Sequence, residues 1–166
     1  TETEAYPSSD PTSHAYERKP TIRTAIQYKN GGYLYEYLIM GLYTITSIVT
    51  GNQGEADVSF IRSVEPIEGV KTMRERRKYF GKNLKRIASG PGLLSQALGL
   101  TPKDNCMYIC DKNSEIKIFK PSLNDFKIGT GTRINLGTNR AKTKEEATQS
   151  INQPWRFYIK GSNFLS

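Results

Sequence analysis

The residues best suited to chemistry lie near the start of the chain. The opening Thr-Glu-Thr-Glu-Ala-Tyr alternates as a β-strand does, which places Glu2, Glu4 and Tyr6 on one face. A Pro-Ser-Ser-Asp-Pro segment then breaks the strand, and the only histidine of the chain, His14, follows it. A carboxylate, an aromatic ring and an imidazole therefore converge near one turn. Taken alone, the pattern also fits an ordinary solvated strand face.

Residues 33–50 have the most strand-like composition in the chain, because they are aromatic and β-branched almost throughout. Met40-Gly41 divides this segment, so we expect a β-hairpin with Met40 at its tip. Alternation places Tyr33, Tyr35 and Tyr37 on one face of the first strand.

Residues 57–64 are predicted to form the next strand, with Val58, Phe60 and Arg62 on one face. Arg62 therefore has the parity of the apolar residues. A buried guanidinium needs an anionic or hydrogen-bonding partner. The alternative is an arginine that reaches water from the sheet edge.

A helix predicted from about Val70 to Phe80 opens a strongly basic stretch. Between residues 71 and 86 the chain carries eight lysines and arginines and one acidic residue, Glu75. Such a run is usually a solvated face. Here it supplies much of the net charge of +8, which favours contact with phosphates.

The remaining segments are less distinctive. Gly90-Pro91-Gly92 precedes a short predicted helix, residues 93–98, and is either an anion site made of backbone N–H groups or a plain helix start. Four further features are predicted: short strands at 107–110 and 116–119, N–H groups with Arg133 at 129–134, a mobile polar loop at 138–153 and a closing strand at 155–159.

Length and composition fit one soluble globular domain. The chain has 166 residues, of which 36% are hydrophobic and 24% charged, and no apolar run is long enough to span a membrane. Its positive charge indicates a polyanionic partner, either nucleic acid or a membrane surface. Cys106 and Cys110 are predicted to be free thiols, since no other cysteine or histidine cluster could complete a metal site.

Taken in order, the motifs resemble the alkyladenine (3-methyladenine, methylpurine) DNA glycosylase family. The resemblance spans nearly the whole chain and rests on the ordered set of segments rather than on any single one. The matching segments are Glu2-Thr-Glu-Ala-Tyr6, Asp10-x-x-Ser-His14, Thr21-x-Arg23, Gly32-x-x-Tyr35-x-Tyr37, Ile61-Arg62-x-x-Glu65-Pro66 with Gly69, Met73-x-x-Arg76, Gly90-Pro91-Gly92 with Gln96-Ala97-Leu98, Arg133-Ile134 and Trp155-Arg156-Phe157-Tyr158.

The resemblance implies a monofunctional enzyme that hydrolytically removes alkylated or deaminated purines from double-stranded DNA. Such enzymes flip the target nucleotide out of the stack and fill the gap with a hairpin side chain. We expect an α+β fold over residues 1–166, a single domain with a curved, mainly antiparallel sheet, a protruding β-hairpin and a few helices. The family's N-terminal helix and first strands are expected to be absent from this chain. No cofactor or metal is expected, and the protein is expected to be a monomer.

The resemblance also implies roles for single residues. Glu4 matches the general base and Arg62 an arginine beside the catalytic water. Three residues match those that hold the flipped base, namely Tyr6, His14 and Tyr37. Contacts with the DNA backbone are assigned to Arg23, Arg76, Arg77, Gly90, Gly92 and Arg133.

Three positions depart from the family pattern. Met40 stands at the hairpin tip, where tyrosine is frequent, and remains an apolar wedge that could intercalate. Ser47 replaces an asparagine that faces the base pocket, and Thr24 replaces an asparagine after Arg23. Met40 and Ser47 leave the range of substrates open.

Two other functions stay open at this point. One is a non-catalytic module of the same fold that grips damaged DNA, against which the retained Glu4 argues. The other is a basic RNA-binding protein whose tyrosines stack bases, although no RNP-like or GXXG signature supports it. A DNA glycosylase would be cytoplasmic, with the nucleoid, in a bacterium or nuclear in a eukaryote, and not secreted.

Overall fold

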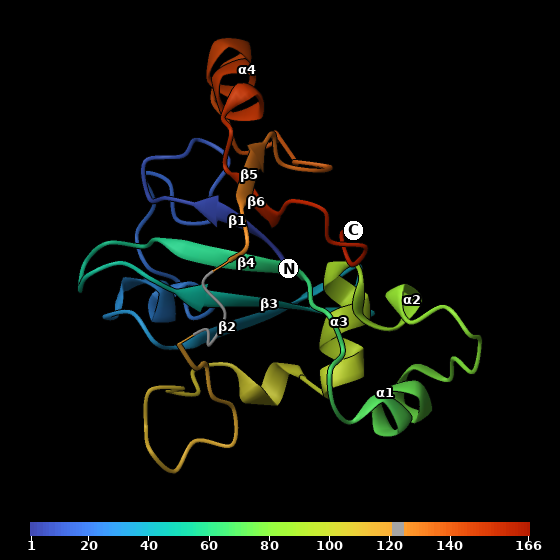
Figure 1. Ribbon diagram of the computed structural model, residues 1–166. Coiled ribbons are helices and arrows are strands. Elements are labelled where there is room, and N and C mark those ends of the chain that lie inside the picture. Colours follow the sequence, from blue (N-terminus) through green and yellow to red (C-terminus); the bar gives the residue numbers. More distant parts are fainter. Residues whose placement is uncertain (121–124) are drawn as a thin grey trace.

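An open antiparallel sheet of six strands organises the molecule (Figure 1). The computed structural model describes residues 1–120 and 125–166. Within them the strand order is β2-β3-β4-β1-β6-β5, and every pairing is antiparallel. The strands are β1 (Glu2–Tyr6), β2 (Leu34–Ile39), β3 (Tyr43–Val49), β4 (Val58–Ser63), β5 (Ile128–Gly131) and β6 (Arg156–Ile159).

Short helices accompany the sheet, which confirms the α+β prediction. The α-helices are α1 (Val70–Arg77), α2 (Lys85–Ala88), α3 (Pro91–Leu98) and α4 (Lys144–Asn152), and the 3₁₀ helices are η1 (Ala25–Tyr28) and η2 (Pro102–Asp104). Figure 1 shows α1, α2 and α3 grouped beside one end of β3 and β4, whereas α4 stands apart beyond β5 and β6.

The predicted first strand lies inside the sheet as β1, between β4 and β6. Glu4 is paired with Phe60 on one side and with Arg156 on the other. The alternation of the sequence is visible in the burial, because Glu2 and Glu4 are almost completely buried while Thr3 and Ala5 are less so. A carboxylate is thus built into the middle of the sheet.

The predicted hairpin is confirmed as β2 and β3, with Met40, Gly41 and Leu42 between the paired residues Ile39 and Tyr43. Met40 and Gly41 have φ values of 54° and 68°, and the Leu42 N–H donates to the Ile39 carbonyl at 3.1 Å. Positive φ at both central residues is the signature of a type I′ turn, whose twist matches that of the strands. Met40 is 85% exposed, so the tip projects into solvent.

The three grouped helices share a small core of Ile87, Ala88, Leu94 and Ala97 with Ile61 of β4 packed against it. Helix α3 also lies very close to β3. A Cβ atom on Gly92 would come within 3.1 Å of the Tyr43 side chain, so a larger residue here would force Tyr43 to shift. Gly92 therefore fixes the start of α3 against the hairpin.

Some sequence predictions were wrong. Residues 107–110 and 116–119 form no strands, and Tyr108 makes a single isolated bridge with Tyr33. The segment 138–153, predicted as a mobile loop, contains helix α4, whose N-cap Thr143 accepts a hydrogen bond from the Glu146 N–H. Helix α1 ends at Arg77, before the predicted end, because Lys78 adopts a left-handed conformation with φ 47°.

Two smaller predictions concern the thiols and the membrane. Cys106 and Cys110 are exposed and form no disulfide, as expected. Within the described part of the chain no helix combines the length and the hydropathy needed to cross a bilayer.

Candidate active site

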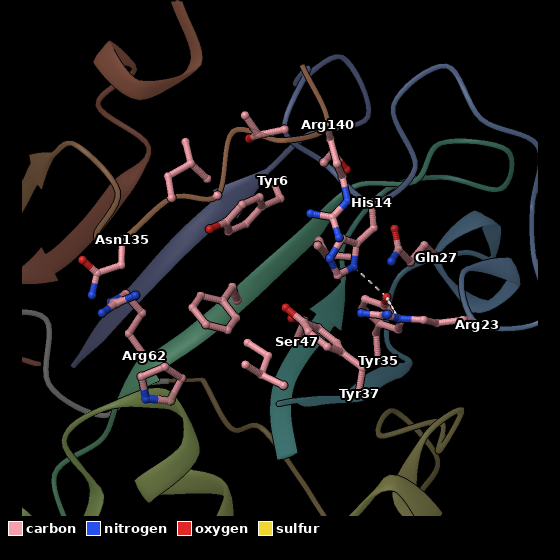
Figure 2. Close-up of a pocket in the computed structure, with 18 of the residues that line it drawn as sticks. Tyr6, His14, Arg23, Gln27, Tyr35, Tyr37, Ser47, Arg62, Asn135 and Arg140 are labelled. Atoms are coloured by element: carbon pink, nitrogen blue, oxygen red, sulfur yellow. Dashed lines mark hydrogen bonds between the residues drawn. The ribbon is translucent and has the colours of Figure 1, made fainter. Parts of the chain in front are cut away.

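A cavity of about 570 Å³ lies over one face of the sheet, along strands β1 to β4 (Figure 2). Aromatic rings and a few convergent polar groups form its wall, which is the usual character of a small-molecule or base pocket. Its lining includes Tyr6, His14, Arg23, Gln27, Tyr35, Tyr37, Ser47, Phe60, Arg62, Pro91, Ile134, Asn135 and Arg140.

Glu4 lies directly beneath this wall and is completely buried. One carboxylate oxygen accepts the Ile134 N–H at 2.7 Å and lies 3.2 Å from Nη1 of Arg62. The other accepts the Tyr6 hydroxyl at 3.0 Å. These three contacts hold the carboxylate in place. Ile134, Arg62 and Tyr6 all line the cavity, so the carboxylate lies one layer below the space where a ligand would lie.

Arg62 is buried, and the anionic partner that its parity required is present. Its Nη1 faces Glu4, its Nε lies 3.4 Å from Glu2, and the same Nε donates to the Ser166 hydroxyl at 3.1 Å. Glu2 is held in turn by Arg156 at 3.3 Å. Two carboxylates and two arginines thus compensate one another, which is the condition for keeping such charges buried.

His14 lies across the cavity from Tyr6, beside Tyr37 (Figure 2). The His14 and Tyr37 ring centroids are 4.9 Å apart, and the Arg23 guanidinium lies 4.6 Å from the Tyr37 ring centroid. Nδ1 of His14 is 2.8 Å from the Tyr35 hydroxyl oxygen. Burial, followed by the nearby positive charges of Arg140, Arg23 and Arg18, lowers the pKa of His14 to about 3. The imidazole is therefore neutral at physiological pH.

Tyr6 and Ser47 complete the opposing walls. The Tyr6 ring meets Phe60 edge to face at 6.0 Å between centroids. Burial and the adjacent Glu4 raise the pKa of the Tyr6 phenol, so it remains a protonated donor to that carboxylate. Ser47 is buried and paired with Tyr35 and Phe60 across neighbouring strands. Figure 2 shows Tyr6 on one side of the cavity and His14 with Tyr37 on the other, a gap with aromatic walls.

The sequence of this chain matches a known protein family. A family model described as methylpurine-DNA glycosylase matches residues 1–163. The chain belongs to the methylpurine-DNA glycosylase family.

Relatives support this membership of the methylpurine-DNA glycosylase family. A protein from Natranaerobius thermophilus is 35% identical over 166 residues, which cover 99% of this chain and 80% of the relative. One from Alkaliphilus oremlandii is 36% identical over 172 residues, with the same coverage of each. One from Methanoculleus marisnigri is 34% identical over 167 residues, again with 99% and 80% covered. All three are named provisionally as 3-methyladenine DNA glycosylases.

The structure brings the central predicted residues together but gives the outlying ones other contacts. Arg76 donates to the carbonyls of Ala97 and Leu98, and Arg77 to the Ile87 carbonyl and the Gln96 amide. Both arginines therefore fasten α1 to its neighbouring helices. Whether they also meet phosphates stays a prediction.

The burial of Arg133 argues against its predicted contact with the DNA backbone. Its guanidinium is wholly buried, pairs with Asp10 and donates to the Ser150 carbonyl. A phosphate cannot reach a guanidinium enclosed in this way. Arg133 therefore has a structural part, and it also stacks over Tyr6 with 4.5 Å between the guanidinium carbon and the ring centroid.

Several residues that line the cavity were not predicted as site residues, among them Tyr35, Gln27, Phe60, Asn135 and Arg140. Phe60 was placed on the correct strand face, and Asn135 directly follows the Arg133-Ile134 motif, so local signals existed for both. Gln27 lies in a 3₁₀ helix and Arg140 in an irregular segment, where no periodicity reveals orientation. Among the described residues, no group of three or more His, Cys, Asp or Glu side chains could hold a metal ion.

Proposed function

We propose that this chain is a DNA glycosylase that removes alkylated purines from double-stranded DNA by hydrolysis. The observation that carries the proposal is the buried carboxylate of Glu4, fixed by three groups that themselves line an aromatic-walled cavity. Family membership and the names of the relatives give the class of reaction.

The cavity would receive a nucleotide extruded from the duplex. Tyr6 would face one side of the base and His14 with Tyr37 the other. Electron-rich ring faces attract cations, so a purine that carries a positive charge after alkylation suits this gap. A cationic base is also the better leaving group. We therefore place alkylated purines first, and neutral deaminated purines such as hypoxanthine second.

Glu4 would act as the general base. It removes a proton from water as the water oxygen bonds to the anomeric carbon and the glycosidic bond breaks, with the bonding electrons leaving on the base. The carboxylate also stabilises the developing oxocarbenium charge. Arg62 and Asn135, which both line the cavity, are suited to orient the water and the adjacent phosphate. Because water is the nucleophile, no strand-cleaving lyase step is part of the proposal.

The hairpin would supply the wedge that occupies the gap in the duplex. Around Met40 the residues Ile39, Leu42 and Tyr43 are also largely exposed. An exposed apolar tip of this kind is typical of an interaction site, and apolar side chains inserted between base steps are a known way to hold distorted DNA.

Contacts with the phosphate backbone would come from the cavity mouth and from α3. Arg23 stands at the mouth, as does Arg140, while Pro91 at the start of α3 also lines the cavity. The Gly90 N–H is taken by the Arg62 carbonyl, so the amides of the first turn, beginning at Gly92, are the candidate phosphate donors.

The decisive test is Glu4→Gln, which keeps the shape of the side chain and removes the base. Single-turnover excision from duplexes that carry 3-methyladenine or hypoxanthine should fall about 10²–10⁴-fold, while binding to the same duplexes is retained. Glu115→Gln is the matched control, because it makes the same chemical change at an exposed position that does not line the cavity, and it should keep nearly full activity. Near-normal excision by Glu4→Gln would remove Glu4 from this role. Tight binding by the unaltered protein without excision of any modified purine would instead identify a non-catalytic binding module.

A further inference from the structure

A directional chain of hydrogen bonds ends at His14. Nε of Arg23 donates to the Tyr35 hydroxyl oxygen at 3.3 Å, and the same hydroxyl lies 2.8 Å from Nδ1 of His14. Tyr35 is 1% exposed, so its hydroxyl group must find its partners inside the protein. Figure 2 shows the bond between Tyr35 and His14 leaving the ring on the side away from Tyr6.

The direction of each bond follows from what the groups can donate. An arginine has donors and no acceptor, so the Tyr35 oxygen is the acceptor in its bond with Arg23. The hydroxyl carries one proton of its own, and the acceptor that the structure offers it is Nδ1 of His14. Tyr35 therefore donates, and Nδ1 is unprotonated. Because His14 is neutral, its single proton must be on Nε2.

The reverse arrangement is disfavoured by the surroundings. If Nδ1 carried the proton, Tyr35 would accept from both His14 and Arg23, and its own buried proton would lack an acceptor, which is costly. The Gln27 side chain does not supply one, because neither its amide nitrogen nor its amide oxygen makes a hydrogen bond in the described structure.

We infer that Tyr35 and Arg23 are positioning residues that lock His14 in the Nε2–H tautomer, so that the cavity requires a hydrogen-bond acceptor of the extruded nucleotide at that point. The acceptor is either a ring nitrogen or carbonyl oxygen of the base, or a phosphate oxygen beside it. This inference rests on the proposed function for the identity of the ligand, whereas the tautomer itself rests on the contacts alone.

The consequence is selectivity. An Nε2–H group repels an amino group, which is also a donor, and a site built around one donor discriminates against a ligand that cannot accept from it. In the opposite tautomer Nε2 would present a lone pair and could accept a hydrogen bond from an amino group. Where the base is the acceptor, the lock therefore works against bases that bring an amino group to this position.

The test is the ¹⁵N NMR spectrum of the whole chain, in which His14 is the only histidine. Two-bond ¹⁵N–¹H correlations should give a pyridine-like Nδ1 and a pyrrole-like Nε2 at neutral pH. Tyr35→Phe removes the donor and keeps the ring, and should shift the populations toward Nδ1–H. Tyr37→Phe is the matched control, because its ring lies 4.9 Å from His14 by centroid and makes no hydrogen bond with it in the described structure. A pyrrole-like Nδ1 in the unaltered protein, or an unchanged tautomer in Tyr35→Phe, would overturn the lock.

Two duplexes distinguish the sources of the acceptor. A duplex with a tetrahydrofuran abasic analogue has the phosphates without the base, and if a phosphate is the acceptor it should shift the Nε2 proton downfield in the unaltered protein. If the base is the acceptor, the shift should need a methylpurine duplex, observed with Glu4→Gln to prevent cleavage. An Nε2 proton that neither duplex shifts would overturn the acceptor requirement. Excision activity together with the wrong tautomer defeats this inference alone, whereas the right tautomer without excision defeats the proposed function alone.

Discussion

At the scale of single residues, the interior keeps its charges by pairing them. Burial alone would raise the pKa of Asp10, yet hydrogen bonds from Arg133, Ser150 and Thr12 hold it below its usual value. The Glu4 carboxylate lies close to three groups, the Tyr6 hydroxyl, the Ile134 N–H and the Arg62 guanidinium. These groups are anchored before any ligand arrives, as preorganised catalysis requires.

Gln27 is the exception among these buried polar groups. It is 1% exposed, and neither its amide nitrogen nor its amide oxygen makes a hydrogen bond in the described structure. A buried amide without partners costs free energy, whereas an apolar side chain of similar shape does not.

We therefore expect Gln27→Met to raise the free energy of unfolding by about 1–3 kcal/mol. Urea unfolding should show a higher midpoint with an unchanged slope. Gln96→Met is the control, since the Gln96 amide is bonded to Arg76 and Arg77, and it should destabilise. A lower midpoint for Gln27→Met would show that its amide is satisfied after all.

At the scale of elements, what could be predicted from sequence depended on periodicity. The alternation of β1 and β4 correctly placed Glu4 and Arg62 on one buried face, because the period of a strand decides which side a residue faces. The hairpin was readable from its composition and from Met40-Gly41. Helix α4 was missed although Thr143 and Glu146 have the spacing of a capping box, since the polar composition of the segment was given more weight.

The residues near 107–119 show the opposite error. Their aromatic and β-branched content suggested strands, but a strand needs an edge to pair with, and in the described structure Tyr108 makes one isolated bridge, with Tyr33 just before β2. The cavity contacts of Gln27 and Arg140 come from a short 3₁₀ helix and from irregular backbone, whose orientation no local pattern specifies. Sequence therefore predicted the sheet side of the site better than its loop side.

Glu36 on β2 shows how the hairpin and α3 depend on each other. It faces away from Tyr35 and Tyr37, accepts the Thr46 hydroxyl at 3.1 Å, and Thr46 in turn contacts Ser95 of α3 at 2.8 Å. Burial raises the pKa of Glu36 to about 8, so the carboxyl group is protonated in the folded protein at neutral pH.

This shift predicts a pH-dependent stability. The folded state holds the Glu36 proton to a higher pH than the unfolded chain, so its contribution is complete below about 4.5 and is lost as pH rises toward about 8. Glu36→Gln cannot ionise, and its stability relative to the unaltered protein should rise across this window by at most about 1.4 kcal/mol per pH unit. Urea unfolding at pH 5, 6.5 and 8 measures the difference. Exposed Glu75→Gln is the control, and a pH-independent difference for Glu36→Gln would contradict the raised pKa.

At the scale of the whole molecule, the elements proposed to meet DNA lie next to one another. The cavity is lined by Leu38 and Ile39 of the hairpin and by Pro91 of α3, and Gly92 is pressed against Tyr43 beside the hairpin tip. Base pocket, wedge and helix N-terminus therefore form a continuous surface. The basic stretch 71–86 extends it through α1 and α2, which pack on α3.

Within that stretch, the lysines and the arginines Arg76 and Arg77 have different roles. Arg76 and Arg77 are bonded to helix carbonyls, so alanine at either position should loosen α1 before it changes DNA contacts. The exposed lysines Lys71, Lys78, Lys82 and Lys85 are free to meet phosphates. The phosphate-tracking hypothesis is therefore best tested on the lysines.

Replacing those four lysines with glutamine should weaken binding to undamaged duplex and flatten its salt dependence. Each phosphate contact contributes about −0.9 to the slope of log affinity against log salt, so losing four contacts would reduce the slope by about 3.6. Fluorescence anisotropy with a short labelled duplex over a range of salt concentrations gives the slope directly.

A second quadruple variant separates local contact from net charge. Lys103, Lys112, Lys117 and Lys120 are also exposed and lie on η2 and the segment after it, so changing them to glutamine removes the same total charge elsewhere. If net charge alone attracted DNA, both variants would lose affinity and salt dependence to a similar degree. If the 71–86 stretch tracks the backbone, its variant should have the flatter slope, while the control retains the slope of the unaltered protein. Equal slopes for all three proteins would make the stretch a solvated helix face and would leave the cavity mouth and α3 as the proposed phosphate contacts.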